Sequence, residues 1–275
     1  MSDLLPRVRY HSVKPQSEQT TYTSSNKPEF LISVGSGRSL VPNSVRILAD
    51  VRVLADSTDS STRSTEMRCF DRNLGGHAFI DTVNVNFSNL GSIEENTNYA
   101  RYVGMDAIAT LNEYDMLNSD KACELRGVTQ KYMTDLAQGI APALTTGTPV
   151  VEDADFSLKP LCCLNKMDSS VNGLPMARSG IIRLGLVLAD NLDAIFGQKA
   201  DINCGYELRN LRCHFKSVPD SKTSEQVVMG IVHNFKSNLL SNEATISTNV
   251  AAMCDSVGIN FIQNQHESVQ VYNSN

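Results

Sequence analysis

Residues 74–103 read LGGHAFIDTVNVNFSNLGSIEENTNYARYV, and this stretch does most to predict the fold. Apolar and polar residues alternate along 77–87, which predicts a strand with one buried face. Ser92 and Glu95 have the spacing of a capping box, so we expect a helix to follow and Gly104 to end or weaken it. The polar residues of the stretch form no reactive cluster. An ordered and chemically quiet stretch favours a structural protein over an enzyme.

The composition limits the class of protein. The chain has 275 residues, a formal net charge of −6 and no Trp, which suits one large all-β domain or two small ones. No run of Lys or Arg supplies a basic face, so we expect no sequence-specific contact with nucleic acid, although a shell around a genome stays open. No stretch approaches the ~18–20 apolar residues of a membrane span, and the first residues lack the apolar core of a signal peptide.

The cysteines and histidines are expected to be structural. Seven cysteines without a tight spacing rule favour free and mostly buried thiols in a reducing compartment. A zinc site would have to use Cys162, Cys163, Cys204, Cys213 and His214. Adjacent residues of a strand point to opposite faces, so Cys162 and Cys163 cannot both reach one metal easily. His77 and His214 lie in or next to expected strands, where a hydrogen-bonded structural role is the simpler interpretation.

Further alternating stretches predict strands on both sides of the opening one. They cover 29–34, 44–54, 67–70, 156–164, 180–189 and 205–218, with weaker candidates at 226–238, 244–250 and 258–262. Pro160 cannot donate a ladder hydrogen bond, so its strand should lie at a sheet edge or break there. The apolar phase changes within 205–218, which predicts a β-bulge near Asn210.

The same pass divides the chain into three parts. Residues 1–27 have no helical or strand period, and we expect a flexible N-terminal arm. Residues 28–218 form the β-rich domain, with a long insertion at about 104–154. Residues 219–275 supply C-terminal strands, which are either part of a second, minimal barrel or an extension of the first.

Acidic loops supply the only candidates for a bound ion. Carboxylates next to the ends of two expected strands have a spacing that calcium tolerates, although solvated turns are the simpler interpretation. These weak metal candidates are Asp153, Asp155, Asp190 and Asp193. We expect no catalytic residue and no cofactor.

Three stretches resemble the double jelly-roll major capsid proteins, the lineage of adenovirus hexon. The stretches are 75–87 leading into 91–94 and 99–102, then 156–158 followed by Leu174-Pro175 and 181–188, and finally 206–211. The resemblance covers roughly residues 28–218 and rests on the positions of apolar residues and glycines. A single-barrel penton or minor capsid protein is a related alternative.

This resemblance implies an all-β, antiparallel jelly-roll sandwich with one short helix and long loop insertions. It implies a capsid subunit that assembles through its barrel faces, loops and terminal arm into an icosahedral shell. The implied partners are copies of itself, as a trimer or pentamer, other capsid proteins and an internal membrane. The implied location is the virion, after synthesis in the cytoplasm or nucleus of a host cell. The alternatives are a carbohydrate-binding β-sandwich module and a metal-dependent jelly-roll enzyme.

Overall fold

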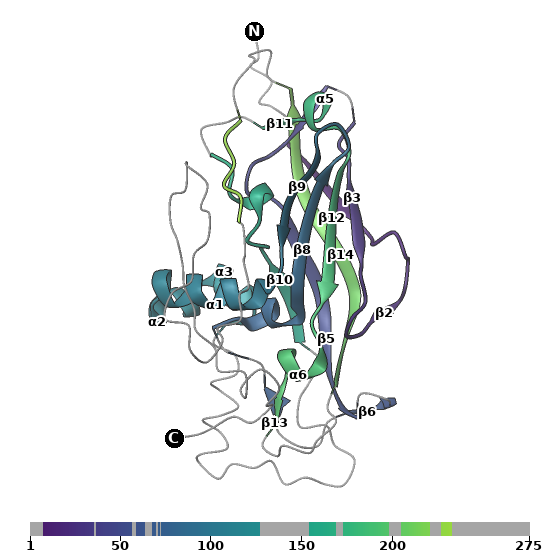
Figure 1. The fold of residues 1–275 in the computed structure, drawn as a ribbon, viewed down its shortest axis with the longest axis vertical. Helices are drawn as coiled ribbons and strands as arrows, with labels where there is room; N and C mark the ends of the chain where they lie inside the picture. Colours follow the sequence, from purple (N-terminus) through teal and green to yellow (C-terminus); the bar gives the residue numbers. More distant parts are fainter. Residues whose placement is uncertain are drawn as a thin grey trace, which may run out of the picture.

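Two antiparallel β-sheets pack face to face in the computed structural model (Figure 1). The structure describes residues 8–35, 37–56, 59–63, 68–69, 71, 73–126, 154–168, 173–197, 205–220 and 227–232. Among these residues, no helix is both long enough and apolar enough to cross a bilayer.

The larger sheet has eight strands and is built around β5 and β14, which pair antiparallel. Its strands are β1 (Arg9–Val13), β2 (Thr21–Tyr22), β4 (Arg38–Leu40), β5 (Arg46–Asp56), β6 (Asp59–Arg63), β10 (Ala154–Leu158), β11 (Leu174–Pro175) and β14 (Gly205–Pro219). The smaller sheet has the order β3-β12-β8-β9, and these strands are β3 (Glu29–Ile32), β12 (Ile182–Leu188), β8 (Ile80–Phe87) and β9 (Gly91–Asn96). A separate short pair joins β7 (Arg68–Cys69) to β13 (Phe196–Gly197).

The order of the strands is that of a complete jelly roll. In the larger sheet, β1 and β2 both pair with one edge of β14. The strand β5 pairs with the other edge of β14, and β10 pairs with β5. The chain alternates between the sheets as it passes through β3, β5 and β8, and it does so again through β9, β10, β12 and β14. Among the described strands, β1 at the start therefore pairs with β14 at the end, and the eight principal ones form one closed sandwich.

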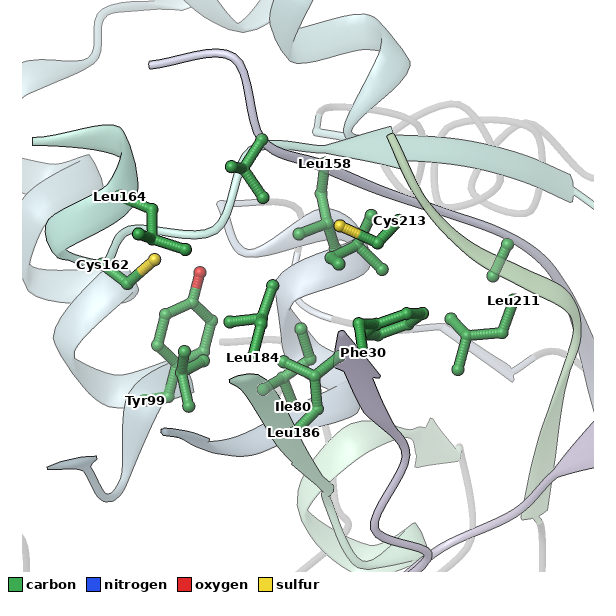
Figure 2. Close-up of a cluster of buried hydrophobic side chains, with 14 of the residues drawn as sticks. Phe30, Ile80, Tyr99, Leu158, Cys162, Leu164, Leu184, Leu186, Leu211 and Cys213 are labelled. Carbon is green, nitrogen blue, oxygen red and sulfur yellow. The ribbon is translucent and has the colours of Figure 1, made fainter. Parts of the chain in front are cut away.

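The apolar core lies between the inner faces of the two sheets because side chains alternate along each strand. Figure 2 shows the contributions of both sheets meeting there: Phe30, Ile80, Leu184 and Leu186 from the smaller sheet, and Leu158, Leu211 and Cys213 from the larger one. All of these side chains are buried. The hydroxyl of the buried Tyr206 donates a hydrogen bond of 2.6 Å to the carbonyl of Ala189, so this polar atom of the core has a partner.

Several predictions about strands are confirmed. The expected strands at 44–54 and 180–189 are β5 and β12. The register of β14 against β5 shifts between Arg209 and Arg212, and Asn210 has φ = 51°, so the predicted bulge is present. The strand β10 lies at the edge of its sheet and ends at Leu158, before Pro160, as the missing N–H requires.

The predicted capping box is wrong. Residues 91–96 form β9, which pairs back on β8 as a hairpin after Gly91 at φ = 84°. Pairing satisfies the backbone of this segment and buries Asn96, which a helix starting at Ser92 would not do. The helix α1 (Tyr99–Thr110) begins later, after Asn98 in the left-handed region, and continues through Gly104.

The expected flexible arm is also wrong in its described part. Residues 9–13 form β1, which pairs with 213–217 of β14, and β2 pairs with the same strand. The side chain of His11 stacks on the Phe215 ring with a centroid separation of 4.9 Å and interplanar angle of 7°, so the segment is held by packing as well as by backbone hydrogen bonds. The polar composition of 1–27 hides this strand because β1 is largely exposed at the edge of the sheet.

The predicted single helix is replaced by several short ones, and part of the insertion is ordered. Beyond α1, the structure has α2 (Glu113–Leu117), α3 (Ser119–Cys123), α5 (Met176–Ser179) and α6 (Asn191–Ala194). The helices α1 to α3 project from one side of the sandwich, with α2 farthest out (Figure 1). The rest of the predicted insertion, 127–153, and the strand candidates at 244–250 and 258–262 lie outside the described residues.

Candidate functional site

The carboxylates named as weak metal candidates do not form a described metal site. Asp155 lies on β10, whereas Asp190 and Asp193 lie at the start of α6. Asp190 instead accepts a hydrogen bond of 2.9 Å from the hydroxyl of Ser25. Asp153 is outside the described residues. Across the described ranges, no three His, Cys, Asp or Glu side chains gather as metal ligands would.

The described core cysteines are sealed from solvent. Cys162, Cys163 and Cys213 are buried free thiols, whereas Cys123 is exposed. Burial raises the pKa of Cys162 to about 12 and also raises the pKa values of Cys163 and Cys213. Because the thiolate is the nucleophile and the metal ligand, these three side chains are chemically inert in the folded protein. Cys204 lies outside the described residues.

A buried hydrogen-bonded chain runs from the end of β10 to His77. The backbone N–H of Leu161 donates to the hydroxyl of Tyr99 at 2.9 Å, and that hydroxyl lies 2.8 Å from Nδ1 of His77. With one hydrogen bond already accepted, the hydroxyl donates to Nδ1 and places the imidazole proton on Nε2. Burial lowers the pKa of His77, so the ring is neutral at neutral pH.

The chain continues into a cluster of buried charges around Glu124. Its Oε2 lies 3.5 Å from Nε2 of His77, 3.2 Å from Nε of Arg126 and 3.4 Å from Nζ of Lys121. Its Oε1 accepts from the backbone N–H of Lys159 at 3.1 Å. Burial by itself raises the pKa of Glu124, but the His77 hydrogen bond and the nearby positive charges outweigh it and hold that pKa below its ordinary value.

This network joins the segment that contains helices α1 to α3 to the barrel. His77 belongs to the 3-10 turn η1 (Gly75–Phe79) that leads into β8, and Glu124 and Arg126 directly follow α3. His77, Glu124 and Arg126 are each 3% exposed or less, so a substrate could not reach them. His77, Glu124 and Arg126 are the residue types of an acid–base site. Because they are buried, their role is structural: they hold the η1 turn against the end of α3. The expectation that His77 is a hydrogen-bonded structural histidine agrees with this geometry.

A second buried carboxylate, Glu94 on β9, holds two backbone segments. Its Oε2 accepts from the N–H of Cys163 at 2.5 Å and its Oε1 accepts from the N–H of Val232 at 3.1 Å. Burial raises the pKa of Glu94, although these two hydrogen bonds lower it in part. The second contact fastens residues 227–232, which lie after the end of β14, onto the barrel.

The outer face of the larger sheet carries a row of Arg, His and Lys side chains. Along β14, Arg212, His214 and Lys216 alternate with the buried residues, and Arg46 pairs with His214 from the neighbouring β5. We call Arg46, Arg212 and Lys216 the cation row. The side chain of Lys216 also lies 5.2 Å from the ring centroid of Tyr10 on β1. Sequence reasoning missed this surface because it looked for a run of Lys and Arg, whereas a strand gathers one face from every second residue.

The opposite charge gathers on residues 105–120, which we call the acidic lobe. These residues span the end of α1, all of α2 and the start of α3, and they hold four carboxylates and no Lys or Arg. Two large apolar side chains also protrude from the lobe: Ile108 is 78% exposed and Tyr114 is 80% exposed. Isolated apolar residues on a surface are common, but an exposed aromatic within a charged rim is typical of protein interfaces.

The outer face of the smaller sheet has a shallow hollow of about 550 Å³. Its floor includes Asn84, Asn86 and Gly185, and the ion pair between Arg183 and Glu29, with an N–O distance of 3.6 Å, borders it. The lining combines polar and apolar surface, and the one aromatic residue there, Phe87, is buried. The hollow has the donors and acceptors for a polar ligand but no aromatic platform.

Comparison with known proteins finds similarity of fold alone. No family model matches the sequence, and no curated protein matches it. The chain is similar to the PBCV-1 capsid protein VP54, as fitted into a reconstruction of the virophage Sputnik, at 13% identity and a TM-score of 0.42, covering 79% of this chain and 44% of that one. It is also similar to the mavirus major capsid protein, at 10% identity and a TM-score of 0.39, covering 78% of this chain and 47% of that one. The major capsid protein of Sulfolobus turreted icosahedral virus matches at 10% identity and a TM-score of 0.31, over 76% of this chain and 48% of that one. The chain therefore spans less than half the length of each of these structures.

Proposed function

We propose that this protein is a structural subunit of a viral capsid, which assembles with copies of itself and with other capsid proteins. The observation that carries the proposal is a complete jelly-roll barrel in which, among the described residues, the titratable and nucleophilic groups with shifted pKa values are buried, apart from His11 at the edge. Such a barrel offers its outer faces and loops for contact with other molecules, and repeated contacts of this kind build symmetric shells. The similar structures are capsid proteins, and we extend that role to this chain only as part of the proposal.

The proposal includes the finer expectations from the sequence. The protein is located in the virion, forms a trimer or pentamer as its first assembly step, and has no catalytic role. The charged surfaces support assembly because interfaces need complementary potentials as well as apolar contacts. We assign no ion to Asp153, Asp155, Asp190 or Asp193, and no cofactor.

A concentration series on the purified protein tests the proposal. We expect light scattering and native mass measurement to show oligomers that grow with protein concentration, and closed particles at the highest concentrations. A strict monomer across the whole series would contradict a capsid role. Purified protein should also show no hydrolytic or redox turnover on a panel of general substrates, which distinguishes it from a jelly-roll enzyme.

One observation favours a second function, that of a ligand-binding module. The hollow over Asn84, Asn86 and Gly185 has the size of a pocket for a small polar molecule such as a sugar. A glycan array tests this function: specific binding that is lost in Asn86→Ala would support it, and an array without binding would remove it. The missing aromatic platform makes us expect no binding.

A further inference from the structure

The two charged surfaces of the barrel fit one another, and this fit bears on how copies of the chain meet. The inference rests on the proposed function, since it names the contact by which the proposed subunit assembles. The contact must join two molecules if the acidic lobe cannot satisfy the cation row of its own chain. The positions of both surfaces in the fold decide this.

Within the part of the chain that the structure describes, the charges of the cation row have little neutralisation. Arg212 and Lys216 are exposed, and neither makes an ion pair with any other residue for which the structure gives a position. Their outward-facing neighbours across the strands are Leu48 beside Arg212 and Tyr10 beside Lys216, which carry no charge. Arg46, at the side of the row nearest β10, is the member with a carboxylate partner.

The partner of Arg46 shows that a carboxylate of the acidic lobe can form an ion pair with a member of the cation row. Asp120, at the base of the acidic lobe, lies 2.9 Å from Nη2 of Arg46. The strand β14 carries the rest of the row and is separated from the lobe's side of the sheet by β5 and β10. Figure 1 shows α2, with Glu113 and Asp115, at the outer end of the lobe and away from both sheets. The tip of the lobe is therefore directed away from the row of its own molecule.

We propose that the tip of the acidic lobe of one copy docks on the cation row of a second copy. Glu113 and Asp115 face Arg212 and Lys216 in this contact, and Tyr114 and Ile108 lose their exposure beside Tyr10 of the second copy. The two surfaces are different, so the contact is head-to-tail. Contacts of this kind close into rings when the rotation between copies allows it, which is the symmetry that trimers and pentamers need. Charges at the rim set the orientation and encounter rate, and the exposed aromatic supplies the buried centre.

Charge reversal on each side tests the contact. The row variant is Arg212→Glu with Lys216→Glu, and the lobe variant is Glu113→Lys with Asp115→Lys. Because Asp115 accepts a hydrogen bond from the backbone N–H of Asn112, Glu113→Lys alone serves as a second lobe variant with the capping box intact. The control is Lys27→Glu with Arg183→Glu, which makes the same change in net charge as the row variant but lies at the hollow on the smaller sheet. Circular dichroism confirms that each variant is folded.

We expect the row variant and the lobe variant each to raise the concentration for half-assembly by about 10-fold or more, because like charges facing each other in an interface are strongly unfavourable. The control should assemble as the wild type does. Combining the row reversal and the lobe reversal in one chain should restore assembly, since every lobe-to-row contact then joins opposite charges again, whatever the number of copies in the ring. Raising the salt above about 0.5 M should weaken wild-type assembly, because surface charges are then screened.

The outcomes separate this inference from the proposed function. If the wild type assembles and both reversed variants assemble equally well, the contact is refuted while a capsid role stands. If both variants fail and the chain that combines the two reversals also fails, the pairing of lobe with row is refuted. If the row variant loses binding to a single-stranded DNA oligonucleotide and keeps its assembly, the row binds nucleic acid and the contact is again refuted. A wild type that stays monomeric at every concentration and salt would overturn both.

Discussion

Replacing Glu124 with Gln should destabilise the protein by about 3 kcal/mol or more. The substitution keeps the shape of the side chain and removes its charge, while the guanidinium of Arg126 stays 1% exposed and loses its carboxylate partner at 3.2 Å. Removing one member of a buried ion pair typically costs about 3–5 kcal/mol, because the remaining charge is left without compensation in a medium of low polarity.

The same part of the fold supplies a matched control. Asp120 and Arg46 form an ion pair with side chains that are 68% and 28% exposed, so water screens both charges. Asp120→Asn should therefore cost less than about 1 kcal/mol. A double variant that combines Glu124→Gln with Arg126→Met removes both buried charges and keeps an oxygen that can accept from the N–H of Lys159, so it should cost less than Glu124→Gln alone.

Urea unfolding measures these free energies, and hydrogen exchange locates the effect. In the Glu124→Gln variant we expect the backbone amides of 99–126 to exchange faster, while β5 and β14 keep their protection, because the cluster joins the helical lobe to the barrel. The reasoning is refuted if Glu124→Gln costs no more than Asp120→Asn, or if the double variant is the least stable of the three.

Three further predictions concern residues around the same cluster and the core. Gly75→Ala should cost at least about 2 kcal/mol in urea unfolding, because Gly75 has φ = 56° and an added Cβ would lie 2.3 Å from the carbonyl oxygen of Glu124; a cost near zero would show that residues 124–126 do not pack there. Burial lowers the pKa of His77, so this side chain binds a proton more readily in the unfolded chain than in the folded one. The free energy of unfolding should therefore fall as the pH drops below about 6.5. A His77→Gln variant should lose that slope between pH 7 and about pH 5, and an unchanged slope would assign it to other groups. With maleimide at neutral pH and mass spectrometry, Cys123 should be modified in the folded protein and Cys162 only after unfolding, and equal labelling of the two would contradict their burial.

Much of the barrel could be predicted because a strand with one buried face has apolar and polar residues in alternation along its sequence. The alternation along 44–54 and 180–189 gave strands at the right place, and the change of apolar phase near Asn210 gave the bulge. These signals are local, so they survive without knowledge of the partner strands. The resemblance to jelly-roll capsid proteins added the expectation of a jelly-roll sandwich, whereas the order of the strands within each sheet came from the structure.

The errors came from segments whose structure depends on distant partners. The strand at 9–13 has a polar, exposed pattern and exists because β14, some 200 residues later, offers an edge to pair with. Ser92 and Glu95 match the start of a helix, but the backbone groups of 91–96 form their hydrogen bonds with β8 in a hairpin instead. The spacing of residues along the sequence does not show whether a helix or a hairpin with a neighbouring strand is more stable.

The surfaces and the buried cluster were hidden for a related reason. Arg212, His214 and Lys216 stood in the outward phase of a strand that was predicted correctly, so reading the polar face of 205–218 would have found the cation row. The pairing of His77 with Glu124 could not be found in this way. It joins residues from a turn and from the end of a helix that meet only in the folded chain.

Electron microscopy of the purified protein after assembly tests the central claim most directly. We predict closed particles with regular symmetry, built from repeated copies of one jelly-roll barrel, in which the larger and smaller sheets, packed face to face, fit the repeating density. Monomers without particles at all protein concentrations, or particles whose repeating unit does not accommodate this barrel, would contradict the claim that the chain is a capsid subunit.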